Sequence, residues 1–374
     1  MDPTPPHESW LTGRTTWLVG ATLVVGLAGA LVLRRAARAP GGLDVLRNSL
    51  RADAPRAWVV IDGKHWHLDG EPGEEPGVTD AREGTRGPCP DGMVHASGAF
   101  LLDANGNEGS GGVERLQDEA CSRWIDREFP ARCAAFDRAK WLRLSEPLPR
   151  KAVNFCIDRF EYPNRLGASP WIVVSYREAQ GLCAAEGRRL CTETEWTYAC
   201  EGDEGQPYPY GYERDGDACV FDRPWRAWNA AAFAVRDSDG LRAELDRLWQ
   251  GEPSGARPAC RSPLGVYDLT GNVDEWTRSV RKEGFPSILK GGYWGPVRAR
   301  CRPSTRAHGE TFVAYQQGFR CCADSPDGPA PSRSGAAPAA HRLPDDAGAP
   351  ALDAGEPDGE APPAPGPAAD LRLD

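Results

Sequence analysis

The segment GVYDLTGNVDEWT, residues 265–277, concentrates oxygen donors in a short turn. Asp268 and Glu275 supply carboxylates and Asn272 supplies an amide, while two glycines allow the backbone to turn sharply. Hard cations such as Ca²⁺ take roughly six to eight oxygen ligands, many of them main-chain carbonyls. The spacing therefore fits a calcium loop, and it also fits a capped turn that precedes a short strand.

Other signatures lie on both sides of this loop. They are, in order along the chain, GMVHASGAF (92–100), FCIDRFEYPN (155–164), RRLCTETEWTYAC (188–200), KGGYW (290–294) and GFRCC (318–322). Taken together, these segments resemble the formylglycine-generating enzyme (sulfatase-modifying factor) family, whose members show KRLPTEAEWEYA-like, GLYDMxGNVWEWT-like, GGSW-like and GFR segments. The resemblance covers roughly residues 88–324.

The resemblance implies an α+β fold that is rich in loops, is related to C-type lectins and is braced by disulfides and calcium. It also implies a ligand set for a structural Ca²⁺. Asp268 and Glu275 would give side-chain oxygens, and Leu269, Gly271 and Val273 would give main-chain carbonyls.

Twelve cysteines lie between Cys89 and Cys322, and no two have CxxC spacing. This pattern favours disulfides in an oxidising compartment over metal sites. The resemblance implies two bridges, Cys183–Cys321 and Cys200–Cys301. The other eight cysteines stay open, with Cys191–Cys322 and Cys219–Cys260 as candidate pairs.

The oxidase centre of the family does not carry over to this chain. In the family, oxidation of a peptidyl cysteine depends on copper held by two thiolates, a soft ligand pair that suits copper(I). The matching interval here, residues 293–300, contains no cysteine. Asp274 stands where the family has a pocket tryptophan, and Tyr293 where it has a serine. We therefore expect neither copper binding nor formylglycine-generating activity.

Two functional interpretations follow. The first is a membrane-anchored binding or structural module for a protein or peptide partner, in which Arg298, Arg300, Arg302 and Arg306 either engage acidic groups or are ordinary solvated charges. The second is an active oxidase, or a related protein-modifying enzyme, with a reorganised site built from Cys301 with Cys322 or Cys191. A glycan-binding role is a third alternative, because the scaffold resembles lectins.

The remaining composition limits location and partners. The 374-residue chain has a net charge of −10 and no basic stripe, which argues against nucleic-acid binding.

After a short tail (1–16), residues 17–33 carry no charge and predict one transmembrane helix of about 25 Å. A buried helix or a cleaved signal peptide are the alternatives. Residues 34–88 predict a linker, with a hairpin at 57–68 around Asp62-Gly63.

The flanking arginines and the cysteines predict opposite orientations of the chain in the membrane. Arg34, Arg35 and Arg38 follow the predicted span and only Arg14 precedes it, which favours a cytoplasmic domain. The cysteines favour the opposite side. We expect a single-pass protein with an extracytoplasmic domain.

Within the predicted domain (89–324), three helices are readable. Ser175 and Glu178 form a capping box for a helix at 175–187, and Thr192 and Glu195 do so for one at 193–200. Leucines at helical spacing predict a surface helix at 240–250, inside an apparent insertion at 222–256. From 325 to 374 the chain is Ala, Pro, Gly and Asp, which predicts a disordered acidic tail.

Overall fold

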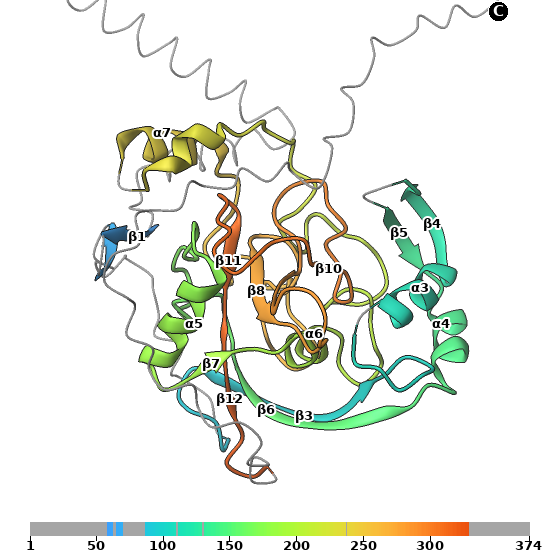
Figure 1. Ribbon diagram of the computed structural model, residues 1–374. Helices are drawn as coiled ribbons and strands as arrows, with labels where there is room; N and C mark the ends of the chain where they lie inside the picture. The colour runs from blue at the N-terminus through green and yellow to red at the C-terminus, as the bar shows by residue number, and fades with distance from the viewer. Residues whose placement is uncertain are drawn as a thin grey trace, which may run out of the picture. The chain divides into compact units, whose positions relative to one another are not determined.

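The computed structural model describes residues 58–62, 65–69, 87–109, 111–128, 131–236 and 238–328 (Figure 1). The predicted transmembrane helix at 17–33 lies outside these residues, as does the tail from residue 329 onward. Among the helices that are described, none combines the length and the apolar character needed to cross a bilayer.

Two four-stranded sheets hold the core of the domain. The first has the order β3-β6-β12-β7, with all neighbours antiparallel, and comprises β3 (Met93–Leu101), β6 (Arg150–Asp158), β12 (Cys321–Asp324) and β7 (Arg189–Leu190). The second has the order β10-β9-β8-β11 and comprises β10 (Ser304–Thr305), β9 (Ser287–Lys290), β8 (Asp274–Arg278) and β11 (Gln317–Phe319), with β11 parallel to β8. Arg320 alone separates β11 from β12, so the chain passes from one sheet to the other at this residue (Figure 1).

Two hairpins complete the strands. β4 (Cys121–Asp126) pairs with β5 (Arg132–Phe136), beside α3 (Gly111–Glu119) and α4 (Arg138–Ser145) (Figure 1). β1 (Trp58–Asp62) pairs with β2 (His65–Asp69), and the partners Asp62 and His65 leave Gly63 and Lys64 between them.

The two predicted capping boxes both form. α5 (Tyr176–Ala185) begins after Ser175, whose hydroxyl accepts from the Glu178 amide while Glu178 accepts from the Ser175 amide. α6 (Glu193–Glu201) begins in the same way at Thr192, with Glu195 as its partner. Each box satisfies two of the amides that a helix start leaves without partners.

The insertion contributes to the core. It contains a 3₁₀ turn, η1 (Ala230–Ala234), and α7 (Asp239–Leu248). The predicted leucine stripe of α7 is buried in a cluster with Val273, Trp294 and Tyr315. α7 therefore packs beside the segments that carry Asp274 and Tyr293.

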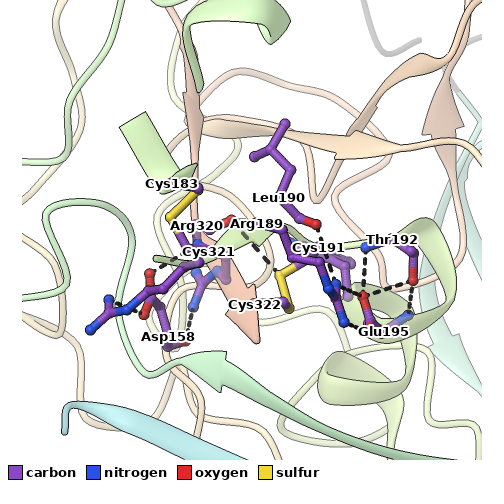
Figure 2. The surroundings of a disulfide bond; sticks show 12 residues. Asp158, Cys183, Arg189, Leu190, Cys191, Thr192, Glu195, Arg320, Cys321 and Cys322 are labelled. Carbon is purple, nitrogen blue, oxygen red and sulfur yellow. Dashed lines mark hydrogen bonds and ion pairs between the residues drawn. A yellow bond between two sulfur atoms is a disulfide. The ribbon is translucent and has the colours of Figure 1, made fainter. Parts of the chain in front are cut away.

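Six disulfides connect all twelve cysteines. The two predicted bridges, Cys183–Cys321 and Cys200–Cys301, are confirmed, and so are the two candidate pairs, Cys191–Cys322 and Cys219–Cys260. The remaining bonds are Cys89–Cys156 and Cys121–Cys133. Neighbouring side chains of a strand point to opposite faces. Cys321 and Cys322 therefore tie β12 to α5 on one side and to the residue after β7 on the other (Figure 2).

Candidate functional site

The predicted calcium loop forms a tight turn immediately before β8. Asp268 and Asn272 have left-handed backbone angles, with φ of 57° and 56°. Gly271 has φ of 79°, and a Cβ at this position would lie 2.3 Å from the Val220 carbonyl oxygen. Only glycine fits there, because the backbone of the neighbouring segment passes too closely for any side chain.

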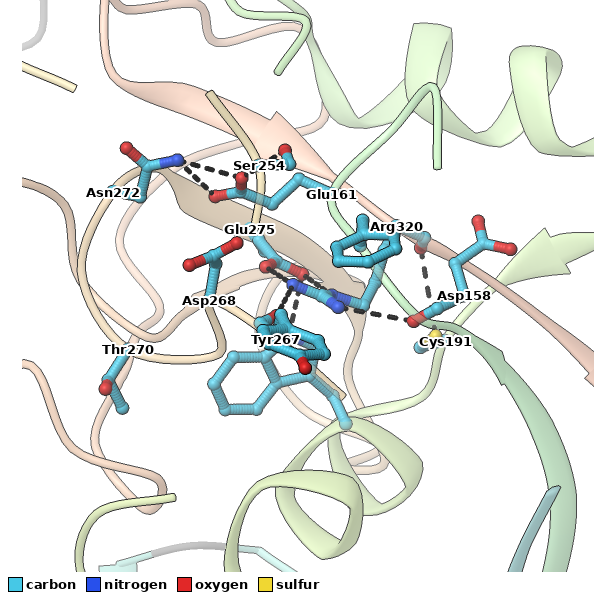
Figure 3. A network of polar contacts seen from close by, with 12 residues as sticks. Asp158, Glu161, Cys191, Ser254, Tyr267, Asp268, Thr270, Asn272, Glu275 and Arg320 are labelled. Atoms are coloured by element: carbon cyan, nitrogen blue, oxygen red, sulfur yellow. Dashed lines mark hydrogen bonds and ion pairs between the residues drawn. The ribbon is translucent and has the colours of Figure 1, made fainter. Parts of the chain in front are cut away.

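Glu275 forms a buried ion pair. Its two carboxylate oxygens accept from Arg320, Oε1 from Nη2 at 2.6 Å and Oε2 from Nε at 2.7 Å (Figure 3). The indole of Trp196 donates to Oε2 as well, at 2.8 Å. Both ion-pair partners are almost fully buried. The role of Glu275 as a calcium ligand stays a prediction, and the guanidinium of Arg320 already balances its charge.

Asn272 fastens the insertion to the loop. Its Nδ2 donates to the carboxylate of Glu161, at 2.8 and 3.1 Å, and its Oδ1 accepts from the Glu252 amide at 2.9 Å. Ser254 donates to the same Glu161 carboxylate at 2.7 Å (Figure 3). The amide thus has a structural role, and Glu161 is a central residue that the sequence analysis missed.

Negative charge exceeds positive charge in this buried network. Glu161, Asp268 and Glu275 surround one guanidinium, that of Arg320 (Figure 3). Burial raises the pKa of Glu161 well above its ordinary value, and the neighbouring carboxylates Asp268 and Glu275 add to the effect. Burial also raises the pKa of Asp268 to about 7. Removing the excess charge requires either protons or a cation, since isolated buried carboxylates are costly.

The predicted ligand set fits a cation only in part. Asp268 offers a carboxylate, although its Oδ2 already accepts from the Gly255 amide at 2.6 Å. The main-chain oxygens of Leu269, Gly271 and Val273 follow in the same turn. Across the described part of the chain, no three His, Cys, Asp or Glu side chains gather in a way that would hold a metal ion. Any site here would depend mainly on main-chain oxygens.

The two altered pocket positions are both engaged in packing. Asp274 is buried, and its Oδ1 accepts from the Gly292 amide at 3.1 Å, which holds the turn after β9. The Tyr293 ring meets that of Tyr315 edge to face, with centroids 6.0 Å apart. It also lies against Gly295, where a Cβ would be 2.7 Å from the ring. Both side chains are thus held by neighbouring residues.

A very shallow surface depression lies beside these residues. We call it the aromatic depression. Its main lining residues are Pro224, Trp225, Arg226, Tyr293, Trp294 and Tyr315. Trp294 is buried against Trp249 of the insertion, with ring centroids 4.9 Å apart. The depression is therefore built jointly by the insertion and by the 293–295 turn.

The displaced thiol pair of the second interpretation does not exist in the structure. Cys301 is bonded to Cys200, and Cys191 is bonded to Cys322. All four are fully buried. The interval 293–300, where the family has its copper ligands, contributes arginine and aromatic side chains instead.

The four arginines of this region are not a free anion-binding surface. Arg298 and Arg300 pair with Glu114 and Asp118 of α3, at 3.0 and 2.9 Å. Arg302 pairs with Glu201, and Arg306 with Glu193. The hypothesis that this group engages an acidic partner is wrong, because acidic side chains of the same chain neutralise it.

Several known proteins are similar to this chain. A bovine protein named "Inactive C-alpha-formylglycine-generating enzyme 2" is 32% identical over 161 residues, which are 41% of this chain and 49% of that protein. A bovine formylglycine-generating enzyme is 28% identical over 179 residues, with 41% and 44% covered. The chain thus spans about half the length of the curated relatives it matches.

The solved structure of PvdO from Pseudomonas aeruginosa is 17% identical and aligns with a TM-score of 0.38, covering 66% of this chain and 97% of PvdO. The family described as the sulfatase-modifying factor enzyme 1-like domain matches residues 132–325, just over half of the chain. Together with the mixed helix and sheet content and the six disulfides, this match shows that the chain belongs to the sulfatase-modifying factor enzyme 1-like domain family.

Proposed function

We propose that this protein is a non-oxidase member of its family, a membrane-anchored binding module for a protein or peptide partner. The observation that carries the proposal is the disulfide pairing of all twelve cysteines, none of which is a free thiol. A thiolate-bound copper centre requires two deprotonated thiols, since the soft metal selects soft ligands. The phenol of Tyr293 and the guanidinium groups of 293–300 cannot replace them.

An oxidation assay tests the loss of activity. The purified full chain, loaded with copper and supplied with a cysteine-containing sulfatase peptide, is expected to produce no aldehyde, because no thiolate pair can hold the metal. Mass spectrometry of the peptide measures the product, and an active formylglycine-generating enzyme run in parallel is the positive control. Steady turnover would overturn the proposal.

Thiol counting in denaturant gives an independent readout of the same centre. Zero free thiols are expected from the six bonds. Two reactive thiols would favour the alternative, an active oxidase or a related protein-modifying enzyme with a reorganised site.

The binding role is supported by the aromatic depression. Trp225 at its rim is 45% exposed, although large apolar side chains usually avoid solvent. Trp and Tyr are also the residues that most often anchor a binding partner, because they bury much area at a low entropy cost. The insertion adds Trp225 to a surface that the 293–295 turn alone would not provide.

A structural Ca²⁺ in the 265–277 loop, with Glu275 among its predicted ligands, is part of the proposal. Asp268 and the carbonyls of Leu269, Gly271 and Val273 would hold the ion, and its charge would offset the excess of buried carboxylates. Ca²⁺ at about 100 times its dissociation constant is expected to raise the free energy of unfolding by about 2.7 kcal/mol. Asp268→Asn should remove most of this gain.

Denaturant unfolding with increasing Ca²⁺ measures the effect. Asp239→Asn is the control, because its carboxylate is fully exposed on α7 and should leave the gain unchanged. An equal response of the Asp268→Asn variant, or no response of the natural chain, would rule out this loop as the site.

The membrane anchor at 17–33 and the extracytoplasmic location complete the proposal. Six disulfides support an oxidising compartment, because thiols stay reduced in the cytosol. Protease added to spheroplasts with intact membranes is expected to remove the acidic tail. Survival of the tail until the membrane is permeabilised would place the domain in the cytoplasm.

A further inference from the structure

We propose that the aromatic depression is a docking site for the chain's own segment DAGEPDGEAPPAPGP, residues 353–367. The inference deepens the proposed function, and it rests on that function only in treating the depression as a binding surface. The segment lies outside the described residues, and the argument therefore starts from the surface.

Hydrogen bonds hold the residues that line the depression in place. Gln250 donates through Nε2 to the Pro224 carbonyl at 3.0 Å, and the Arg223 amide donates to the Trp294 carbonyl at 2.8 Å. These bonds fix the 223–226 stretch, which has no regular secondary structure, against the 293–295 turn. Trp225 is thereby presented to solvent on a rigid support. A preformed surface binds more tightly, because little entropy is lost on binding.

The rim also carries positive charge. Arg226 is exposed and donates to the Arg247 carbonyl, and within the described residues its guanidinium has no carboxylate partner. Arg223 and Arg247 lie close by and pair with Glu252 and Glu244. The guanidinium of Arg226, next to the exposed indole of Trp225, can therefore bind a carboxylate of a ligand. An acidic ligand with a flat or rigid apolar part matches this combination.

The segment 353–367 has both properties. It contains Asp353, Glu356, Asp358 and Glu360 and no basic residue, and it continues into Pro362, Pro363, Pro365 and Pro367. Proline-rich chains favour the polyproline II conformation and bind grooves lined by Trp and Tyr. The carboxylates would face Arg226, and the proline rings would stack on Trp225 and Tyr293.

The connection keeps the segment close to the domain. Residues 329–352 separate the last described residue from the segment. A flexible linker of this length has an end-to-end distance of roughly 25–30 Å, which gives an effective concentration in the millimolar range. A weak peptide contact is therefore largely formed when the ligand is on the same chain.

Protease sensitivity of the full chain tests the docking. Cleavage after Glu360 by a Glu-specific protease is expected to be roughly fivefold to tenfold slower in the natural chain than in Trp225→Ala or Arg226→Glu, which corresponds to about 1–1.4 kcal/mol. Tryptic cleavage after Arg342, outside the docked segment, should be equal in all three chains. Phe285→Ala is the matched control, because Phe285 is 49% exposed elsewhere on the domain.

Three outcomes would overturn the inference. Equal cleavage after Glu360 in all chains would show that the segment is free. Protection that survives both substitutions would place the segment elsewhere, and protection that rises with protein concentration would assign it to a second copy of the chain. In these cases the proposed function is tested separately, by binding of acidic proline-containing peptides in trans and by its loss in Trp225→Ala.

Discussion

Arg320→Met is expected to lower the free energy of unfolding by about 3–5 kcal/mol, the usual cost of leaving a buried charge without its partner. The guanidinium is fully buried and neutralises Glu275, and it also donates to the main-chain oxygens of Tyr267 at 2.9 Å and Asp158 at 3.2 Å. Its loss would leave Glu161, Asp268 and Glu275 without a cation in a buried network. Denaturant unfolding at neutral pH, with the disulfides intact, measures the change.

Two matched variants separate this effect from a general cost of losing arginine. Arg138→Met breaks an exposed pair with Glu204 and should cost far less, because solvent screens such a pair. Glu275→Gln combined with Arg320→Met should be less destabilising than Arg320→Met alone, because the buried carboxylate is removed as well. A small loss in Arg320→Met, close to that of Arg138→Met, would contradict the central role of the ion pair.

Removing the Cys89–Cys156 bond, by serine at both positions, is expected to have a similarly large effect. The bond joins residues 67 apart in sequence, and the chain-entropy relation gives about 4 kcal/mol for a loop of this size. Among the described residues no second disulfide joins the same two segments, whereas Cys183–Cys321 and Cys191–Cys322 run in parallel and each keeps the other's long loop closed. Unfolding in denaturant compares the variant with the natural chain.

The Cys121–Cys133 bond is the natural control for this experiment. It spans only 12 residues of the β4–β5 hairpin, for which the same relation gives about 3 kcal/mol. Its removal should therefore cost less and should leave the two four-stranded sheets intact. A larger loss from the hairpin bond than from Cys89–Cys156 would show that loop size does not govern the contribution of these disulfides.

Short-range signals in the sequence predicted local structure well. Ser175 with Glu178, and Thr192 with Glu195, lie three residues apart, and a capping box requires only that spacing and the two residue types. The leucine period of the insertion predicted α7 in the same way. These features depend on contacts within one or two helical turns, which a linear sequence displays directly.

Contacts between distant segments could not be predicted from the sequence. Glu275 is predicted to bind calcium because its neighbours in sequence offer oxygens, and its ion-pair partner Arg320 lies 45 residues later. The arginines of 298–300 were expected to face a partner, yet Glu114 and Asp118 of α3 neutralise them across more than 180 residues. Nothing in either segment alone indicates such a neighbour.

The order of the sequence motifs indicated the family by resemblance, while residue type and count predicted paired cysteines and the lack of a thiol pair at residues 293–300. Only the tertiary structure decided which charges meet, that Asp274 and Tyr293 are engaged in packing, and that the insertion supplies Trp225 to an aromatic surface. The physical reason is that ion pairs, burial and surface shape depend on distances in space, and the chain brings these groups together only when it folds.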